Sequence, residues 1–406
     1  MGSVPTNFFR RKRQVRGNRQ KDVLGAMSAA EEEQFFEDLA ADCASAGLDA
    51  QDLDRFEAFC ANARLAANGD LEQWHPVLET GQNVLSGKFF PGLTAMPTWP
   101  SDGGEGGPSA FAWLRDLERH TPAIAAELRT VCDATLPSGG TGTGAGHTND
   151  AGGELNGRDD WYSLGTDNRV AMADLFPGLT DTERNIYVPG FDDRPGNGYC
   201  QAVLVANEEP QRIADLFPIT TAALKSSGVR TGVRLVAFGK QLPHTALHWH
   251  SDGRNFMLTA HLPLGGPKRA SGERVPPYGP PAPAFPDEAT RLGVAGMQLA
   301  PLAVADDGRM QMSDRSVAKS WDVGDGVVFD TTFFHSAYND GDEAADILFI
   351  DFFHPELTDA EVTALKCFQR SLRAVGEAAK QKRQRRSLRA RLARLVPPVL
   401  TRWRRD

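Results

Sequence analysis

The sequence predicts a mainly β fold with a helical N-terminal part. Residues 29–87 are rich in good helix formers and repeat apolar side chains at spacings of three and four, which is the pattern of helices. From residue 229 onward the chain changes to short apolar, β-branched runs, of which 233–238 (Val-Arg-Leu-Val-Ala-Phe) is the clearest strand. With 406 residues, 41% of them hydrophobic, the chain is long enough for one large domain with appendages or for two domains.

Taken in order, the chain divides into four segments. We expect a basic N-terminal arm at 1–28, a helical segment at 29–87, a β domain at 88–358, and a C-terminal helix with a basic amphipathic tail at 359–406. Inside the β domain, helical patterns at 111–131 and 210–228 precede the strands. A proline-rich stretch predicts a long inserted loop at 265–310, and long loops in compact domains are often functional.

The positions of His250, Asp252 and His335 in the sequence predict a metal centre. His250 and Asp252 are two residues apart, and on a β-strand such residues point to the same face. His335 follows 83 residues after Asp252, at the end of a second strand-like run. Two imidazoles and one carboxylate on one face of an Fe(II) ion leave the opposite positions open, as in non-haem iron oxygenases. A His and an Asp at this spacing also arise by chance at strand ends, so by themselves they leave both interpretations open.

The residues around these positions form a series of spaced motifs. They are Asn255 and His261, five and eleven residues after His250; Phe329-Asp330 ahead of His335; His354-Pro-Glu-Leu357; and, upstream, Phe90-Pro-Gly-Leu93 and Phe111-Ala-Trp-Leu114. The series resembles the aspartyl/asparaginyl β-hydroxylase family over about residues 88–358. The resemblance implies a double-stranded β-helix (jelly roll) in which His250, Asp252 and His335 bind Fe(II) and 2-oxoglutarate is the co-substrate.

The chain also departs from the family pattern. Relatives that hydroxylate animal proteins have Gly two residues after the first His, whereas Asp252 here completes the triad, as in the branch that hydroxylates lipid A acyl chains. The family binds 2-oxoglutarate with an Arg-x-His pair and a later Arg. This chain has Thr259 ahead of His261, and Ala345 at the later position. A guanidinium binds a carboxylate through parallel N–H donors, so we expect another cation to take over this task.

The co-substrate pocket has five candidate residues. We expect it to be lined by His261, by Arg254 and by Trp161, which resembles the family's Trp ahead of the barrel. Arg234 and Lys240 are the other cations that a neighbouring strand can bring to it. No catalytic side chain is expected beyond the metal centre.

The predicted function is that of an Fe(II)/2-oxoglutarate-dependent dioxygenase that hydroxylates a C–H bond of a peptidyl, small-molecule or lipid-acyl substrate. Three alternatives stand beside each other. A lipid-acyl hydroxylase at a membrane surface is favoured by the basic tail and the complete triad. A peptide Asp/Asn hydroxylase is favoured by the overall resemblance. A non-catalytic metal-binding or scaffold protein that kept the barrel but lost the co-substrate anchor is favoured by Thr259 and Ala345.

Cysteine usage and hydropathy bear on localisation. The five cysteines are odd in number, widely spaced and lack any Cys-x-x-Cys pairing. That pattern favours reduced thiols in an intracellular compartment, cytoplasmic or organellar, and disfavours a peptide hydroxylase of an oxidising compartment. No run of 18 or more apolar residues is present, so no transmembrane helix is expected.

Charge is unevenly distributed along the chain. Residues 1–24 carry +6 and residues 380–406 carry +10, and since the whole chain carries −9, the body between them carries −25. The N-terminal arm is either a disordered basic arm or a targeting sequence. The C-terminal tail repeats apolar residues at spacings of three and four between arginines from Leu388 to Trp403, interrupted by Pro397-Pro398, which indicates a basic amphipathic helix. Such a helix either binds an anionic membrane surface peripherally or packs on the protein's own body. Nucleic acid is not an expected partner, because no recognised nucleic-acid module accompanies the charge.

Overall fold

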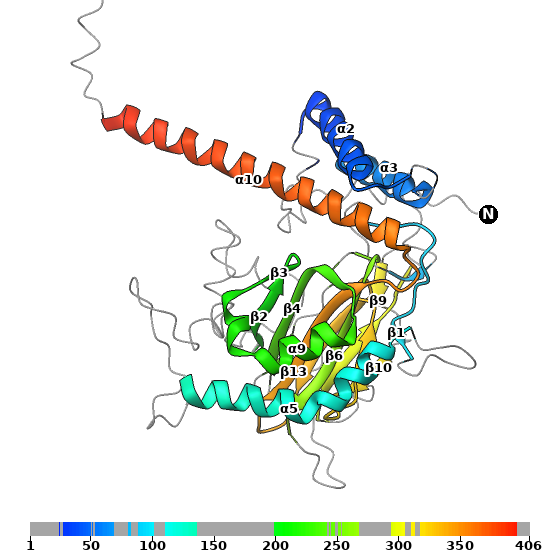
Figure 1. The fold of residues 1–406 in the computed structure, drawn as a ribbon, viewed down its shortest axis with the longest axis vertical. Coiled ribbons are helices and arrows are strands. Elements are labelled where there is room, and N and C mark those ends of the chain that lie inside the picture. Colours follow the sequence, from blue (N-terminus) through cyan, green and yellow to red (C-terminus); the bar gives the residue numbers. More distant parts are fainter. Residues whose placement is uncertain are drawn as a thin grey trace, which may run out of the picture. The chain divides into compact units, whose positions relative to one another are not determined.

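The computed structural model describes residues 24, 27–49, 51, 53–68, 80–82, 88–100, 110–135, 199–241, 243, 245–247, 251–252, 254–267, 294–304, 310–312 and 317–395. The chain forms two compact units (Figure 1). The β unit contains residues 1–18 and 70–357, and the helical unit contains residues 19–69 and 358–406.

The β unit is built on antiparallel sheets. A seven-stranded sheet has the order β1-β11-β6-β13-β4-β2-β3, and a four-stranded sheet has the order β10-β7-β12-β5. The larger sheet comprises β1 (Thr98–Trp99), β2 (Tyr199–Ala206), β3 (Glu209–Pro210), β4 (Thr231–Gln241), β6 (Met257–Gly265), β11 (Val327–Phe329) and β13 (Ala345–Phe353). The smaller sheet comprises β5 (Thr245–Ala246), β7 (Ala295–Ala300), β10 (Val317–Ser320) and β12 (Phe334–Asn339), and β8 (Leu302–Val304) pairs separately with β9 (Met310–Met312). The predicted mainly β character with added helices is confirmed.

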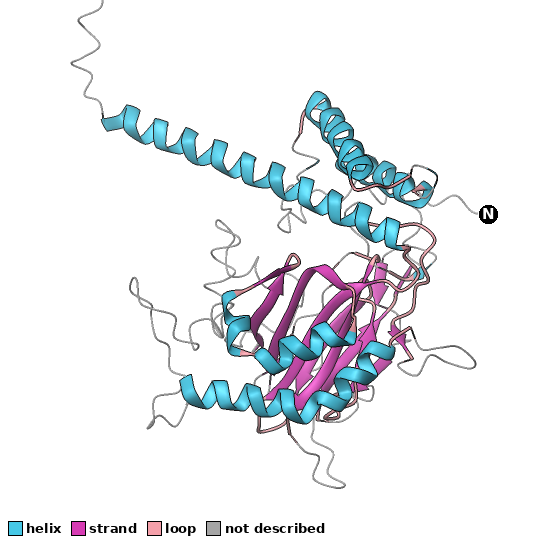
Figure 2. Ribbon diagram, in the orientation of Figure 1, coloured by secondary structure: helices cyan, strands magenta, loops and turns pink. Residues whose placement is uncertain are grey.

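Two helices cover one face of the seven-stranded sheet (Figure 2): α5 (Ala112–Thr135) and α9 (Pro218–Ser227), the latter preceded by the 3-10 helix η4 (Arg212–Leu216). All three lie where apolar periodicity predicted helices. The structure differs from the sequence prediction at 265–310, because β7 and β8 lie inside the predicted loop. β7 is a wholly buried strand paired on both sides, by β10 and β12, so it shows no apolar–polar alternation that would have revealed it next to the prolines.

Hydrophobic residues pack on both faces of the seven-stranded sheet. On one face, Phe238 of β4 and Leu348 of β13 belong to the same core as Leu117 of α5. On the other face, which we call the inner face, Phe349 of β13 packs in a second core with Leu299 of β7. Because the second core contains residues of both sheets, the sheets face each other, and side chains of the inner face are positioned to line a site between them.

The helical unit contains α2 (Ala29–Ser45), α3 (Asp54–Asn68) and α10 (Asp359–Leu395). α2 begins with a capping box in which Ser28 and Glu31 exchange hydrogen bonds. The ring of Phe368 in α10 packs edge-on against Phe35 of α2 and Phe59 of α3, with centroid separations of 5.8 and 5.0 Å. These aromatic contacts join the three helices into one core.

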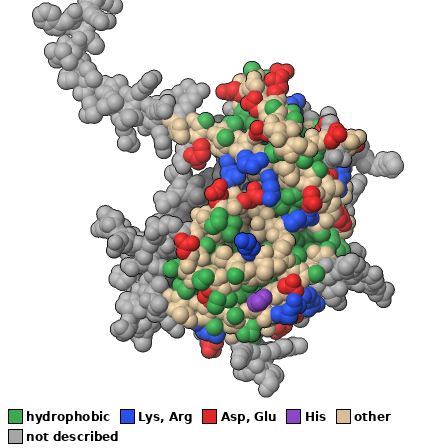
Figure 3. Space-filling view, viewed as in Figure 1, with side chains coloured by type: hydrophobic (Ala, Val, Ile, Leu, Met, Phe, Trp, Pro, Cys, Tyr) green, Lys and Arg blue, Asp and Glu red, His purple; other side chains and the backbone are tan. Residues whose placement is uncertain are grey.

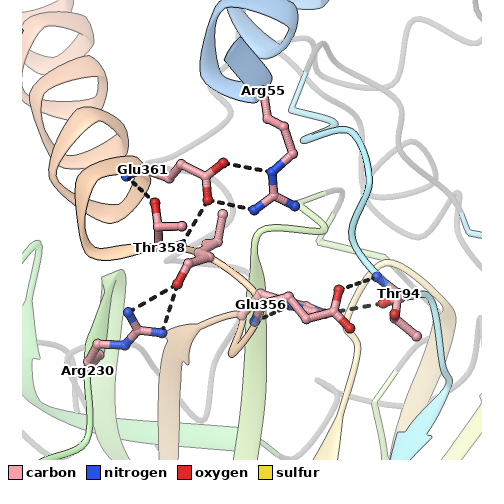
Figure 4. Close-up of polar contacts among 8 residues, drawn as sticks. Arg55, Thr94, Arg230, Glu356, Thr358 and Glu361 are labelled. Carbon is pink, nitrogen blue, oxygen red and sulfur yellow. Dashed lines mark hydrogen bonds and ion pairs between the residues drawn. The ribbon is translucent and has the colours of Figure 1, made fainter. Parts of the chain in front are cut away.

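A buried carboxylate at the start of α10 also joins two helices of this unit (Figure 4). The side chain of Glu361 is 4% exposed and accepts two hydrogen bonds from the guanidinium of Arg55, at 2.7 and 2.6 Å. It also accepts the backbone N–H of Thr358 at 2.8 Å, which satisfies a donor at the helix N-terminus. The paired geometry makes this a strong charge-assisted contact between α3 and α10.

No helix in the described part of the chain is long and apolar enough to cross a membrane. On the face drawn in Figure 3, basic and acidic side chains are interspersed and hydrophobic side chains are scattered among them. Among the described residues, the large hydrophobic side chains that are strongly exposed are Leu216, Ile219 and Val323.

Candidate metal centre and co-substrate pocket

Hydrogen bonds bring two of the predicted iron ligands into one region of the β unit. The backbone N–H of Asp252 donates to the carbonyl of Thr331 at 2.9 Å. The hydroxyl of Ser251 donates to the carbonyl of Thr332 at 3.0 Å. These bonds hold the Asp252 segment against the turn that leads into β12, whose second residue is His335. The fold therefore brings Asp252 and His335 into one region, although they are far apart in the sequence.

His335 is buried and lies on the inner face, because it alternates on β12 with Ala337 of the core between the sheets. Its Nδ1 lies 2.9 Å from the carbonyl oxygen of Phe333. A carbonyl only accepts, so Nδ1 carries the hydrogen and Nε2 carries the lone pair. Ligating histidines in metalloproteins are oriented by this kind of second hydrogen bond. The orientation of His335 fits a metal ligand.

The turn ahead of His335 is fixed by Asp330, which is completely buried. Its carboxylate accepts the backbone N–H and the hydroxyl of Thr332 at 2.8 and 2.6 Å, and the side-chain amide of Gln82 at 2.7 Å. Burial raises the pKa of Asp330 to about 6, although these hydrogen bonds act to lower it. The Asp of the Phe-Asp motif is thus a structural residue that sets the path of the chain into His335.

Arg234 of β4 joins two carboxylates. Its Nη1 forms an ion pair with Asp252, and its Nε lies 3.4 Å from Oδ2 of Asp351 on β13, whose side chain is 1% exposed. Burial acts to lower the pKa of Arg234, but the charges of Asp252 and Asp351 raise it above its usual value. Arg234 is therefore a fixed cation beside a predicted metal ligand.

An irregularity in the sheet lets Arg234 reach this position. The pairing of β4 with β13 shifts at Asp351, so that residues 232–235 of β4 lie opposite this one residue. Extra residues in one strand re-aim the side chains there. In a regular strand, Arg234 would share with Val236 the face that the helices cover.

His261 of β6 lies among aromatic rings of the inner face. Its ring centroid is 5.5, 4.8 and 5.3 Å from those of Trp321, Phe329 and Phe349. Burial, with a smaller contribution from His335, lowers the pKa of His261 to about 3, so the ring is neutral. Within the described part of the chain, neither nitrogen of His261 has a hydrogen-bond partner, and the indole nitrogen of Trp321 is also buried without one. Buried polar groups are normally paired, so these nitrogens mark a place where a bound molecule would supply partners.

Arg254 is a second cation near the predicted ligand Asp252. Burial and the charge of Arg234 lower the pKa of Arg254, while Asp252 and Asp351 act in the opposite direction. Its Nε is buried and has no hydrogen-bond partner among the described residues. A guanidinium in this situation gains most from an anionic ligand.

The other two pocket candidates, Lys240 and Trp161, are not found on the inner face among the described residues. Lys240 forms an ion pair with Asp346 and alternates with Phe238 onto the helix-covered face, so it does not point to the inner face. Trp161 and His250 lie outside the described residues. The sequence prediction did not include Asp351 or Trp321. For Asp351, the available signal was a polar residue between the apolar residues Ile350 and Phe352.

Two other motif residues hold the entry segment at residues 88–100. The side chain of Asn255 accepts the N–H of Phe90 at 2.6 Å and donates to its carbonyl at 2.8 Å. His354 lies 3.2 Å from the carbonyl of Thr94, and Glu356 accepts the N–H of Thr94 at 2.8 Å (Figure 4). His354 is therefore a hydrogen-bonded structural histidine.

The two predicted ligands that the structure describes carry donor atoms of types that Fe(II) accepts. Asp252 offers a carboxylate oxygen and His335 an imidazole nitrogen, and both ligand types suit Fe(II). Among the residues that the structure describes, no group of three or more His, Cys, Asp or Glu side chains is arranged to hold a metal ion. The predicted third ligand, His250, falls outside them.

A family comparison covers the same region. Residues 192–275 and 297–355 match the family model described as aspartyl/asparaginyl beta-hydroxylase. The match includes Asp252, His261 and His335, and it confirms the family resemblance that the spaced motifs indicated. It indicates a hydroxylase- or oxygenase-like enzyme.

Comparison with curated proteins finds no significant match. Similar solved structures include a 2OG-Fe(II) oxygenase-family oxidoreductase from Burkholderia pseudomallei (11% identity, 57% of this chain and 89% of that chain, TM-score 0.22). They also include a prolyl-4-hydroxylase from Pseudomonas putida (12% identity, 38% and 73%, TM-score 0.20) and a predicted oxalate decarboxylase from Thermotoga maritima (12% identity, 38% and 80%, TM-score 0.19). At these TM-scores the likeness carries no argument about function.

Proposed function

We propose that this protein is a non-haem Fe(II) oxygenase that uses 2-oxoglutarate to hydroxylate a C–H bond of a peptidyl, small-molecule or lipid-acyl substrate. The observation that carries the proposal is the pair of hydrogen bonds holding the Asp252 segment against the turn into His335, within the region that matches the hydroxylase family. In this proposal the two facing sheets are the halves of a double-stranded β-helix, and His250 supplies the third ligand.

The chain's own residues orient and protect the centre. When bound, Fe(II) together with 2-oxoglutarate supplies the activation of O₂ that oxidises an unactivated C–H bond. Asp252 contributes the anionic oxygen ligand, and Arg234 fixes the direction of its carboxylate. His335 presents Nε2 because its Nδ1 hydrogen is held by Phe333. The aromatic rings around His261 keep the inner face dry, which strengthens polar contacts made there.

We propose that 2-oxoglutarate lies against His261 and Arg254, with Trp161 as a further contact. Among the described residues, neither nitrogen of His261 nor the Nε of Arg254 has a hydrogen-bond partner, which supports this placement. A neutral imidazole donates one hydrogen bond and accepts another, and a guanidinium donates to a carboxylate. Together they give the co-substrate one cationic and one neutral contact.

The proposal predicts that the purified protein binds one Fe(II) and forms succinate from 2-oxoglutarate when O₂ and a substrate from a peptide or acyl-lipid pool are present. Asp252→Ala is expected to weaken metal binding by more than about 100-fold, since changes to residues behind the ligands already cost 10–100-fold. Succinate formation should be lost with it. Calorimetry with Mn(II) and a succinate assay provide the two measurements.

Asp346→Ala is the matched control, because Asp346 is also a partly exposed, ion-paired carboxylate but lies with Lys240 away from the inner face. It should leave both measurements unchanged. A wild-type protein that binds the metal but neither binds nor consumes 2-oxoglutarate would instead establish the alternative, a metal-binding or scaffold protein without the co-substrate anchor.

We also propose that residues 380–406 give the protein peripheral affinity for anionic membranes. α10 runs to Leu395 and ends just ahead of Pro397, so much of the basic tail continues a helix. Each cation near an anionic leaflet contributes about 1 kcal/mol, and this attraction is screened over about 8 Å at physiological salt.

Deleting residues 380–406 should therefore reduce co-sedimentation with phosphatidylserine-containing vesicles, most strongly at low salt, and leave turnover of a small soluble substrate unchanged. Neutral phosphatidylcholine vesicles are the control and should bind neither form. If the deletion instead unfolds the helical unit, as measured by thermal denaturation, the apolar stripe packs on the protein itself and this proposal fails.

A further inference from the structure

Thr259 occupies the position at which the family pattern has an arginine, and its neutral side chain supplies no positive charge to bind a carboxylate. Its hydroxyl donates a 2.6 Å hydrogen bond to Asp351, its direct cross-strand partner, and both side chains are 1% exposed. Burial raises the pKa of Asp351, whereas a nearby cation and the hydrogen bond both act to lower it. Thr259 supplies the hydrogen bond, so the charge has to come from another strand.

That charge comes from Arg234 on β4. A guanidinium carries five N–H donors in one plane. The Nε of Arg234 faces Asp351 at 3.4 Å, while its Nη1 is directed to the predicted metal ligand Asp252. The Nε edge of the guanidinium thus faces Asp351 within the sheet, and Nη1 faces Asp252 at the predicted metal centre.

We propose that Arg234 replaces the arginine that is missing at position 259 and binds the 2-oxoglutarate carboxylate that lies beside the metal. This inference rests on the proposed function and adds Arg234 to His261 and Arg254. Asp351 attracts the guanidinium at Nε as an ion pair at 3.4 Å, and its Oδ2 has no hydrogen-bond partner among the described residues. While Nη1 stays paired with Asp252, the Nη2 donors of Arg234 bind the co-substrate's carboxylate.

The charges of the site agree with this arrangement. Counted as formal charges, the two cations Arg234 and Arg254 balance the two carboxylates Asp252 and Asp351 beside them. A divalent metal ion then leaves an excess of two positive charges, which a dicarboxylate such as 2-oxoglutarate neutralises. A ligand without negative charge would leave that excess buried.

The test is the affinity of 2-oxoglutarate for protein saturated with Mn(II), measured by calorimetry without O₂. The double variant Arg234→Gln/Asp351→Asn removes the cation without leaving its carboxylate partner charged, and it should bind 2-oxoglutarate about 10- to 100-fold more weakly. The variant Arg234→Gln/Thr259→Arg returns the cation to β6, beside Asp351, and should recover most of the lost affinity.

The matched control is Lys240→Gln/Asp346→Asn, which neutralises the other ion pair between β4 and β13, on the helix-covered face. It should bind 2-oxoglutarate like the wild type. Unchanged affinity in Arg234→Gln/Asp351→Asn, or a loss that the relocated arginine does not recover while Mn(II) stoichiometry is kept, overturns the inference and leaves the proposed function standing. A Mn(II)-loaded wild type that does not bind 2-oxoglutarate overturns the proposed co-substrate, and this inference with it.

Discussion

Replacing His335 by Ala is expected to abolish turnover and to weaken Fe(II) or Mn(II) binding by more than about 100-fold. The substitution removes an imidazole whose Nδ1 hydrogen is held by the carbonyl of Phe333 and whose Nε2 is thereby presented as the ligand nitrogen. The fold should survive, because the change costs about 1 kcal/mol for the lost hydrogen bond and somewhat more for the cavity. Metal titration followed by calorimetry measures the effect directly.

His354→Gln is the matched control for this variant. His354 is also buried and hydrogen-bonded, but its contacts hold Thr94 of the entry segment. It should lower stability and keep metal stoichiometry. If His335→Ala bound iron as tightly as the unmutated protein, His335 would not be a ligand and the proposed iron centre would be lost.

Replacing Glu127 by Ala is expected to lower the free energy of unfolding of the β unit by about 3 kcal/mol. Glu127 of α5 is buried and accepts the backbone N–H groups of Ile219 and Thr220 at 2.7 and 2.9 Å, and the hydroxyl of Thr220 at 2.7 Å. Its carboxylate therefore caps the N-terminus of α9, where the helix dipole also favours a negative charge. Without it, buried donors at the start of α9 lose their acceptor.

The measurement is the urea midpoint of the transition that reports the β unit, at constant slope. Asp116→Ala is the control on the same helix. Asp116 is half exposed and pairs with Arg119 on the surface, so its loss should change stability by less than about 0.5 kcal/mol. Equal midpoints for the Glu127 and Asp116 variants would show that the cap contributes nothing.

The sequence by itself determined the features that depend on local pattern. Apolar periodicity predicted helices where α5 and α9 form, because a buried helix face repeats every three to four residues regardless of what it packs against. The spaced motifs indicated the family resemblance, and they singled out Asp252 and His335 as candidate ligands, because motif spacing is readable from residue numbers alone. The sequence pattern did not predict strand β7, because a fully buried strand shows no alternation of apolar and polar residues.

Only the tertiary structure decided which cations face the inner side of the sheets. Arg234 and Lys240 are an even number of residues apart on β4, so strand alternation alone would place both side chains on the same face. The bulge opposite Asp351 instead directs Arg234 to Asp252, while Lys240 follows the regular alternation and points to the helix-covered face. Sequence patterns do not encode a bulge, because it arises from the register between strands distant in the chain. The burial of His261 likewise follows from rings contributed by three other segments, and no local pattern predicts that its nitrogens lack hydrogen-bond partners among the described residues.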